Sequence, residues 1–176
     1  MADPHRAPEF HPGSKPGMFP SQIDQFSQAI AALDEQGKAS FCVWLAVRMQ
    51  ESLAAEDAER VGICHAVELL QSWEAGESVT GNELNELLMN ANDEGLHAFV
   101  DSRRPRKTDS AIEVVGGAIC YIAWLAYRRA GESLPDGIDQ VNDDFIIWVI
   151  QQALDAQTVT REYCLSAMQG LAKVSE

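Results

Sequence analysis

Apolar residues recur every three or four positions along most of the chain, and this spacing predicts helices rather than strands. The first three helices are expected at residues 21–37, 38–53 and 55–75. Thr80 and Glu83 match the capping-box pattern and predict the start of a fourth helix. No alternation of β-branched residues bounded by turns is present, so we predict no sheet.

The most informative segment is an apolar run at residues 114–127 (VVGGAICYIAWLAY), which carries no charged side chain. It predicts one helix over about 110–129, with Asp109 and Ser110 as N-cap residues and Gly131 as the C-cap. The run is shorter than the ~20 residues that a transmembrane helix needs. A helix that is apolar all round lies inside a globular core. We therefore predict an all-α, single-domain bundle of about six or seven helices around this central helix.

Turn and cap residues place the remaining elements. The fourth helix is expected to break at 92–95, and a short segment at 97–100 leads into a loop at 101–108. A sixth helix is predicted to begin near Asn142 and a last one at Thr160, because both residue types are favourable N-caps.

The N-terminal residues differ from the rest in composition. Residues 1–20 hold five of the seven prolines and are predicted to be a disordered tail, either native or added for expression. Residues 21–176 are then one all-helical domain, whose size is sufficient for a hydrophobic core. No apolar secretory segment is seen, so the expected location is the cytoplasm.

The charge of the chain is strongly negative. Asp and Glu number 27 against 13 Lys and Arg, which gives a net charge of -14. Such a surface repels nucleic acid and anionic membranes and attracts basic proteins. The basic segment 103–107 (RRPRK) is interpreted as a solvated loop paired with nearby acids. Simple solubility is the alternative explanation of the acidity.

The cysteines and tryptophans are interpreted as core residues. The cysteines are far apart in apolar helical contexts, which is typical of reduced, buried thiols. The tryptophans each lie on a predicted apolar helix face. Gly116 and Gly117 are expected where another helix crosses the central helix closely. The cysteines are Cys42, Cys64, Cys120 and Cys164, and the tryptophans are Trp44, Trp73, Trp124 and Trp148.

No catalytic motif is found. Glu94 and His97 form a single Glu-x-x-His pair, whereas a di-iron bundle needs two such pairs and two further glutamates. Cys64 could reach His97 as a nucleophile and base, but no third orienting residue is in evidence. We therefore expect no enzyme activity, no metal and no cofactor. Glu113 is interpreted either as a first-turn acid of the central helix or as a half-buried carboxylate that faces a partner.

Several segments together resemble a known family. They are residues 38–48 (KASFCVWLAVR), 108–112 (TDSAI), 119–127 (ICYIAWLAY), Leu134-Pro135 and the acidic turn at 139–144. The pattern over residues 21–174 resembles the sixth immunity-protein family of bacterial polymorphic toxin systems. The resemblance implies an α-helical, non-enzymatic protein that binds a cognate toxin domain and inhibits it.

Charge and resemblance lead to one hypothesis for the partner and its binding surface. The expected partner is a basic, nucleic-acid-targeting toxin domain, because an acidic inhibitor can mimic phosphate charge. A helical bundle that binds a metal or small molecule, or a regulatory or scaffold domain, are the alternatives. Neither a nucleic acid nor a membrane is an expected partner. The predicted partner-binding residues form two acidic clusters: Glu83, Glu86, Asp93 and Glu94, and Asp136, Asp139, Asp143 and Asp144.

Overall fold

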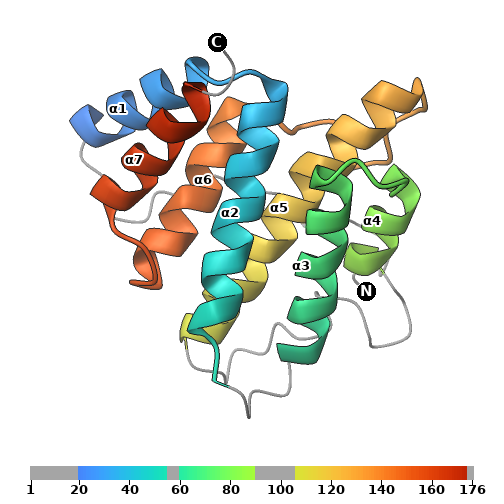
Figure 1. Cartoon of the computed structure of the whole chain (residues 1–176), viewed down its shortest axis with the longest axis horizontal. Helices are drawn as coiled ribbons and strands as arrows, with labels where there is room; N and C mark the ends of the chain where they lie inside the picture. Colours follow the sequence, from blue (N-terminus) through green and yellow to red (C-terminus); the bar gives the residue numbers. More distant parts are fainter. Residues whose placement is uncertain (1–19, 55–59, 90–105, 174–176) are drawn as a thin grey trace, which may run out of the picture.

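The computed structural model describes residues 20–54, 60–89 and 106–173, and within these ranges every regular element is a helix (Figure 1). The helices of the described residues are α1 (Pro20–Ala31), α2 (Glu35–Ser52), α3 (Arg60–Glu74), α4 (Gly81–Met89), α5 (Arg106–Ala130), α6 (Asp143–Asp155) and α7 (Arg161–Ala172). The predicted all-α bundle is confirmed.

Helix α5 is the centre of the bundle. It packs against α2, α3, α4 and α6, while α1 and α7 cover the side formed by α2 and α6 (Figure 1). Val114, Ile119 and Ile122 of α5 are completely buried. The start of α2 is bonded both to the start of α6 and to the end of α5, so α2 and α6 run in one direction and α5 runs in the other.

The central helix is longer than predicted. It has 25 residues and begins at Arg106, so Asp109 lies in its first turn and the expectation that Asp109 and Ser110 are N-caps was wrong. By length and composition, the segment 109–130 could cross a membrane. The expectation that the apolar helix is too short to do so, which considered only residues 114–127, was therefore wrong. However, 72% of its most apolar window is buried inside the protein, as in the core helix of a soluble protein.

Most other helix ends follow the predicted caps. Asn142 Oδ1 accepts a hydrogen bond from the Phe145 N–H at 3.0 Å, and Thr160 Oγ1 accepts one from the Tyr163 N–H at 3.2 Å. Gly131 ends α5 with φ +70°, a left-handed conformation that favours glycine. These contacts satisfy backbone groups that a helix end would otherwise leave unbonded.

The boundary between the first two helices was predicted wrongly. Helix α1 ends at Ala31, and Gly37 lies inside the first turn of α2 rather than after the end of α1. Asp34 is the N-cap of α2, and its carboxylate accepts a hydrogen bond from the Gly37 N–H at 2.6 Å. A Cβ at position 37 would lie 3.1 Å from the Asp34 oxygen, a tight contact that a small shift of this side chain would relieve. The third helix begins at Arg60, and the preceding residues 55–59 lie outside the described ranges.

The two central glycines have different surroundings. A Cβ at Gly117 would lie 2.5 Å from Cγ2 of the buried Val149, so the predicted close crossing is real and its partner is α6. A Cβ at Gly116 would lie 3.7 Å from the side chain of Leu88 in α4, which is ordinary contact. Only Gly117 is therefore required by packing.

The prediction that all four tryptophans belong to the core was also too broad. Trp73 is 9% exposed, whereas Trp44, Trp124 and Trp148 are only half-buried and pack against the edge of the core. Two of these rings make cation–π contacts with arginines. The Arg129 guanidinium lies 5.0 Å from the centre of the Trp73 ring, and the Arg128 guanidinium lies 4.5 Å from the centre of the Trp124 ring.

Candidate partner-binding surface

The first predicted acidic cluster lies on the outer side of α4. Both Glu83 and Glu86 are exposed, and Glu83 closes the capping box by accepting hydrogen bonds from the Thr80 N–H at 2.8 Å and the Thr80 hydroxyl at 2.7 Å. These bonds to Thr80 lower the pKa of Glu83. Glu86 accepts a hydrogen bond from the Asn82 amide at 2.9 Å. Asp93 and Glu94 lie outside the described residues.

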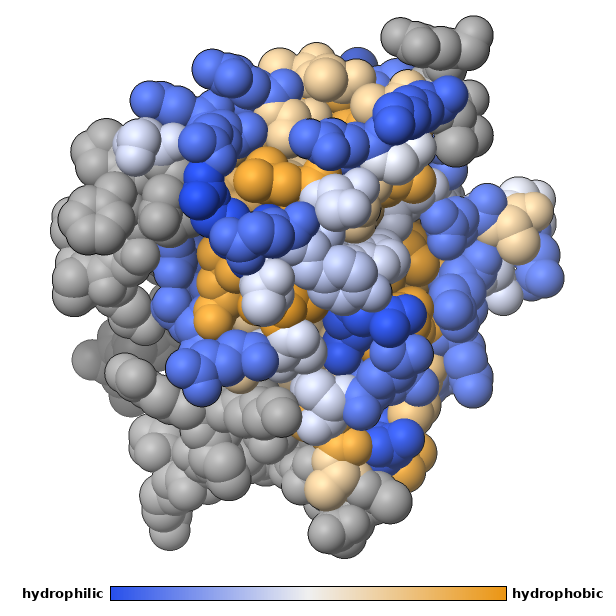
Figure 2. All heavy atoms as spheres, turned by 60° about the vertical axis from the view of Figure 1, so that its left-hand side comes forward, coloured by the Kyte–Doolittle hydropathy of each residue, from blue (hydrophilic) through white to orange (hydrophobic). Residues whose placement is uncertain are grey.

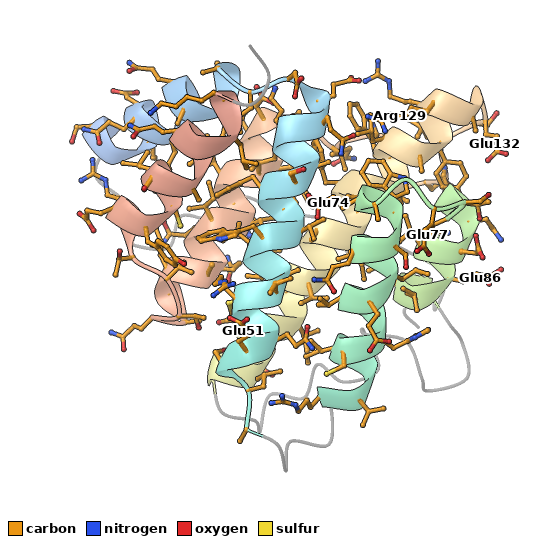
Figure 3. All side chains as sticks on the ribbon, in the orientation of Figure 1. Glu51, Glu74, Glu77, Glu86, Arg129 and Glu132 are labelled. Carbon is orange, nitrogen blue, oxygen red and sulfur yellow. The ribbon has the colours of Figure 1, made fainter. Side chains whose placement is uncertain are left out.

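The structure adds three glutamates that the sequence patterns missed. Glu74 ends α3, Glu77 lies in the loop before α4, and Glu132 follows α5; all three are exposed. Figure 3 shows Glu77, Glu86 and Glu132 in the same region, beside the end of α5. We call Glu74, Glu77, Glu83, Glu86 and Glu132 the α4 acidic face.

Two contacts hold the elements of this face together. The ring of Tyr127 in α5 packs so closely on Gly81 that a Cβ there would lie 2.6 Å from the ring. Burial raises the pKa of Tyr127, and the negative charges of Glu132 and Glu86 raise it further. The contact between Gly81 and Tyr127 brings the start of α4, the helix of Glu86, against the end of α5, which Glu132 follows. Glu86 and Glu132 are far apart in the sequence, so no local sequence pattern could predict that they lie in the same region.

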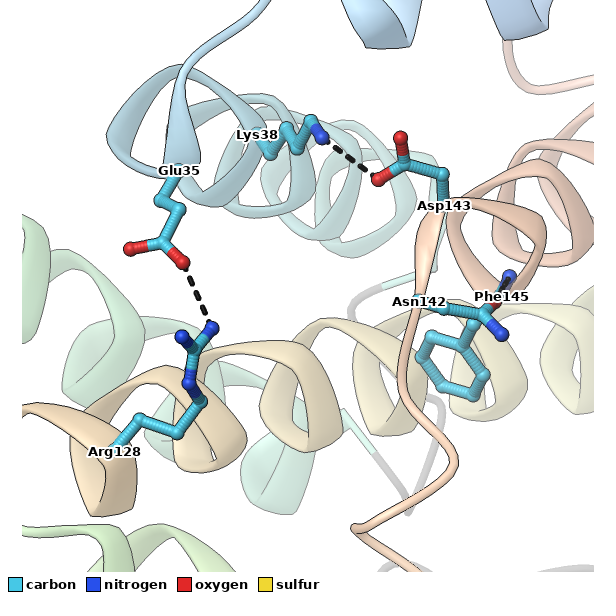
Figure 4. A network of polar contacts seen from close by, with 6 residues as sticks. All are labelled: Glu35, Lys38, Arg128, Asn142, Asp143 and Phe145. Carbon is cyan, nitrogen blue, oxygen red and sulfur yellow. Dashed lines mark hydrogen bonds and ion pairs between the residues drawn. The ribbon is translucent and has the colours of Figure 1, made fainter. Parts of the chain in front are cut away.

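The second predicted cluster lies in the segment that leads into α6. Asp136, Asp139 and Asp144 are exposed and form no ion pair with any basic side chain that the structure describes. Asp143 differs, because its carboxylate pairs with the Lys38 ammonium at 2.7 Å (Figure 4). The charge of Asp143 is therefore partly neutralised by α2.

The described acids of both clusters lie toward one end of the bundle. Figure 4 shows the start of α2 between two partners, with Glu35 bonded to Arg128 of α5 at 2.8 Å and Lys38 bonded to Asp143 of α6. The segment from Glu132 to Asn142 joins the end of α5 to the start of α6 at this same end. We refer to the α4 acidic face together with Asp136, Asp139 and Asp144 as the acidic end.

Most of the described basic side chains have partners within the protein. Among those that the structure describes, every one except Lys173 is bonded to or stacked on another part of the protein. Among the described residues, the exposed acids without a cation partner are Asp24, Asp34, Glu68, Glu74, Glu77, Glu83, Glu86, Glu132, Asp136, Asp139, Asp144, Asp155 and Glu162. The negative charge of the chain is thus concentrated on accessible carboxylates.

Glu113 is half-buried but faces the protein's own α6. When the Gln152 side-chain amide is oriented to satisfy both neighbours, its nitrogen donates a hydrogen bond to the Glu113 carboxylate at 2.6 Å. Its oxygen accepts one from the Trp148 indole N–H at 3.2 Å. Because α5 begins at Arg106, Glu113 is not in its first turn, and that interpretation was wrong. Sequence patterns gave no signal for the buried Gln152, which is 8% exposed.

Nothing in the described residues supports a metal site or a nucleophilic cysteine. No group of three or more His, Cys, Asp or Glu side chains in these ranges could hold a metal ion. His65 is exposed on α3, and His97 lies outside the described ranges. Burial raises the pKa of Cys42, Cys120 and Cys164 to about 12, which suppresses their thiolate forms at neutral pH. Cys64 is half-buried and accepts a hydrogen bond from Gln50 at 3.2 Å.

Comparison with known families decides the class of protein. The model of the family described as immunity protein Imm6 matches residues 37–156, which is more than half of the chain. The chain belongs to the Imm6 immunity protein family. This Imm6 member is matched from the first turn of α2 to the C-cap of α6, so both parts of the acidic end fall within the matched segment. No curated protein and no solved structure matches the chain.

Membership confirms the predicted family and indicates a toxin-neutralising role with a cognate toxin protein as partner. Immunity proteins of this kind are generally non-enzymatic.

Proposed function

We propose that this Imm6 protein neutralises a basic, nucleic-acid-targeting toxin domain in the cytoplasm by binding it through the acidic end. The observation that carries the proposal is the distribution of charge. The described basic side chains except Lys173 have internal partners, whereas carboxylates from α3, α4 and the segment before α6 are exposed at one end. Such a surface accelerates encounter with a basic protein and occupies the positions where that protein holds phosphate.

The test compares charge reversals at two places on the protein. In the first variant, Glu86→Lys and Glu132→Lys change the acidic end, and in the matched control Asp24→Lys and Glu68→Lys change α1 and α3 by the same net charge. All four residues are exposed and lack an internal cation. Asp143 is avoided because it pairs with Lys38.

The measurement is stopped-flow association with an inactive form of the cognate toxin domain, at several salt concentrations. We expect the first variant to associate about 10-fold more slowly and with a weaker salt dependence, because charges near an interface act chiefly on the association rate. The control should associate within about twofold of the unmodified protein. Equal effects of the two variants would show that net charge, rather than the acidic end, attracts the toxin.

A further inference from the structure

Arg129, in the last turn of α5, is held in one orientation by two contacts. Its guanidinium stacks on the Trp73 ring of α3, 5.0 Å from the ring centre, and its Nη2 donates a hydrogen bond to Gln36 Oε1 of α2 at 3.0 Å. Trp73 is only 9% exposed, so its ring is a fixed platform for the arginine. A long side chain that is already oriented loses little further conformational entropy when it binds a ligand.

Arg129 differs in exposure and partners from the other arginines whose side chains are described. Three of these are half-buried: Arg48, Arg60 and Arg161. Arg161 lies on the side of α1 and α7, where Figure 2 shows apolar residues reaching the surface between hydrophilic ones. Arg128 is exposed like Arg129, but its guanidinium is bonded to the Glu35 carboxylate at 2.8 Å. Within the described ranges Arg129 has no carboxylate partner, and Gln36 occupies one of its N–H donors and leaves the rest available.

The surroundings of Arg129 are acidic. Glu74 follows Trp73 in the chain, and Glu132 comes one turn after Arg129; both glutamates are exposed and belong to the α4 acidic face. Figure 3 shows Arg129 and Glu132 at the same end of α5. A basic toxin domain that contacts these glutamates is repelled by the guanidinium unless it places an acidic group opposite Arg129. A planar guanidinium can hold such a carboxylate by two parallel hydrogen bonds.

Acidic groups also occur inside the basic sites of proteins that act on nucleic acid. Metal-dependent nucleases and polymerases bind Mg²⁺ through carboxylates, beside the position of the substrate phosphate. We propose that Arg129 binds an Asp or Glu carboxylate of the toxin domain, and that this contact fixes the orientation in which the acidic end docks. This inference rests on the proposed function and adds to it one contact of opposite polarity, in which this protein supplies the cation.

The test replaces Arg129 and, as a matched control, Arg128. Arg129→Gln removes the charge, whereas Arg129→Lys keeps the charge without the planar fork. Arg128→Gln removes the same charge from the same turn of α5, at an arginine that also stacks on a tryptophan. Binding to the cognate toxin domain, made inactive without replacing an acidic residue, is measured by surface plasmon resonance. The melting temperature of each variant shows whether its fold is retained.

We expect Arg129→Gln to dissociate about 10- to 100-fold faster, because a carboxylate of the toxin loses its charged partner. The dissociation rate of Arg129→Lys should lie between those of Arg129→Gln and the unmodified protein. The association rate of Arg129→Gln should be unchanged or higher, because the variant makes the acidic end more negative. Faster dissociation without slower association distinguishes a direct contact from a general effect of charge.

The control should behave differently, because the carboxylate partner of Arg128 is Glu35 of the protein itself. Arg128→Gln should dissociate within about twofold of the unmodified protein. Unchanged dissociation of Arg129→Gln, or an equal increase in Arg128→Gln, would overturn this inference while leaving the proposed function intact. If Arg129→Gln does not fold, the same comparison is made with Arg129→Lys. No binding by the unmodified protein would overturn both.

Discussion

Substitution of Gly117 by alanine tests the central packing of the bundle. An added Cβ would lie 2.5 Å from Cγ2 of Val149 and 3.5 Å from the Trp148 ring, so α5 and α6 must move apart or Val149 must leave its position. Overpacking of a filled core costs about 1–3 kcal/mol. Replacing glycine by alanine inside a helix gains about 1 kcal/mol. We therefore expect a net loss of up to about 2 kcal/mol in the free energy of unfolding.

Gly116→Ala is the matched control, because it makes the same chemical change one residue earlier in the same helix. Its Cβ would meet only the Leu88 side chain at 3.7 Å, so the gain in helix propensity should remain and stabilise the protein by about 0.5–1 kcal/mol. Urea denaturation followed by circular dichroism measures both free energies. Equal stability of the two variants would refute the close crossing of α5 and α6.

A double-mutant cycle locates the cause of the Gly117→Ala effect. If the clash is with Val149, then Gly117→Ala should cost less in a Val149→Ala background than in the unmodified protein. A coupling energy of about 0.5–3 kcal/mol is expected for residues in direct contact. A cycle with no coupling would assign the loss to another neighbour.

Three further predictions concern stability and thiol chemistry. In urea denaturation, Trp73→Ala should cost about 3–5 kcal/mol and Trp124→Ala less than that, because Trp124 is half-buried; the reverse order would contradict the burial. Labelling with a thiol reagent at pH 8 should modify Cys64 first, because burial raises the pKa of the other three thiols to about 12. First labelling of Cys42 would contradict this order. Thr80→Ala should cost about 1 kcal/mol at pH 7. The pKa of Glu83 is lowered in the folded protein, so the stability from its bonds to Thr80 is present above the ordinary pKa of Glu and is lost as the pH falls. The difference in unfolding free energy between Thr80→Ala and the unmodified protein should therefore shrink near pH 3.

The sequence predicted best the features that depend on neighbouring residues. The capping box at Thr80 and the caps Asn142 and Thr160 are local hydrogen bonds, and each is present. The start of α5 was predicted wrongly because an acid in the first turn and an acid at the N-cap are both favourable, so Asp109 did not distinguish them. Gly37 was mistaken for a helix end because glycine is typical just after a helix, whereas here it follows the N-cap Asp34 in the first turn of α2.

The surface could not be predicted from local patterns, because its charge depends on pairs that are distant in sequence. Asp143 meets Lys38 across 105 positions, and Arg128 meets Glu35 across 93. Asp143 and Asp144 are equivalent in sequence, as two acids in the first turn of α6, yet of these two only Asp143 pairs with a cation in the described part of the chain. If the acidic end attracts the toxin, reversal of Asp144 should therefore slow association more than reversal of Asp143, whereas reversal of Asp143 should also destabilise the fold by placing a cation beside Lys38.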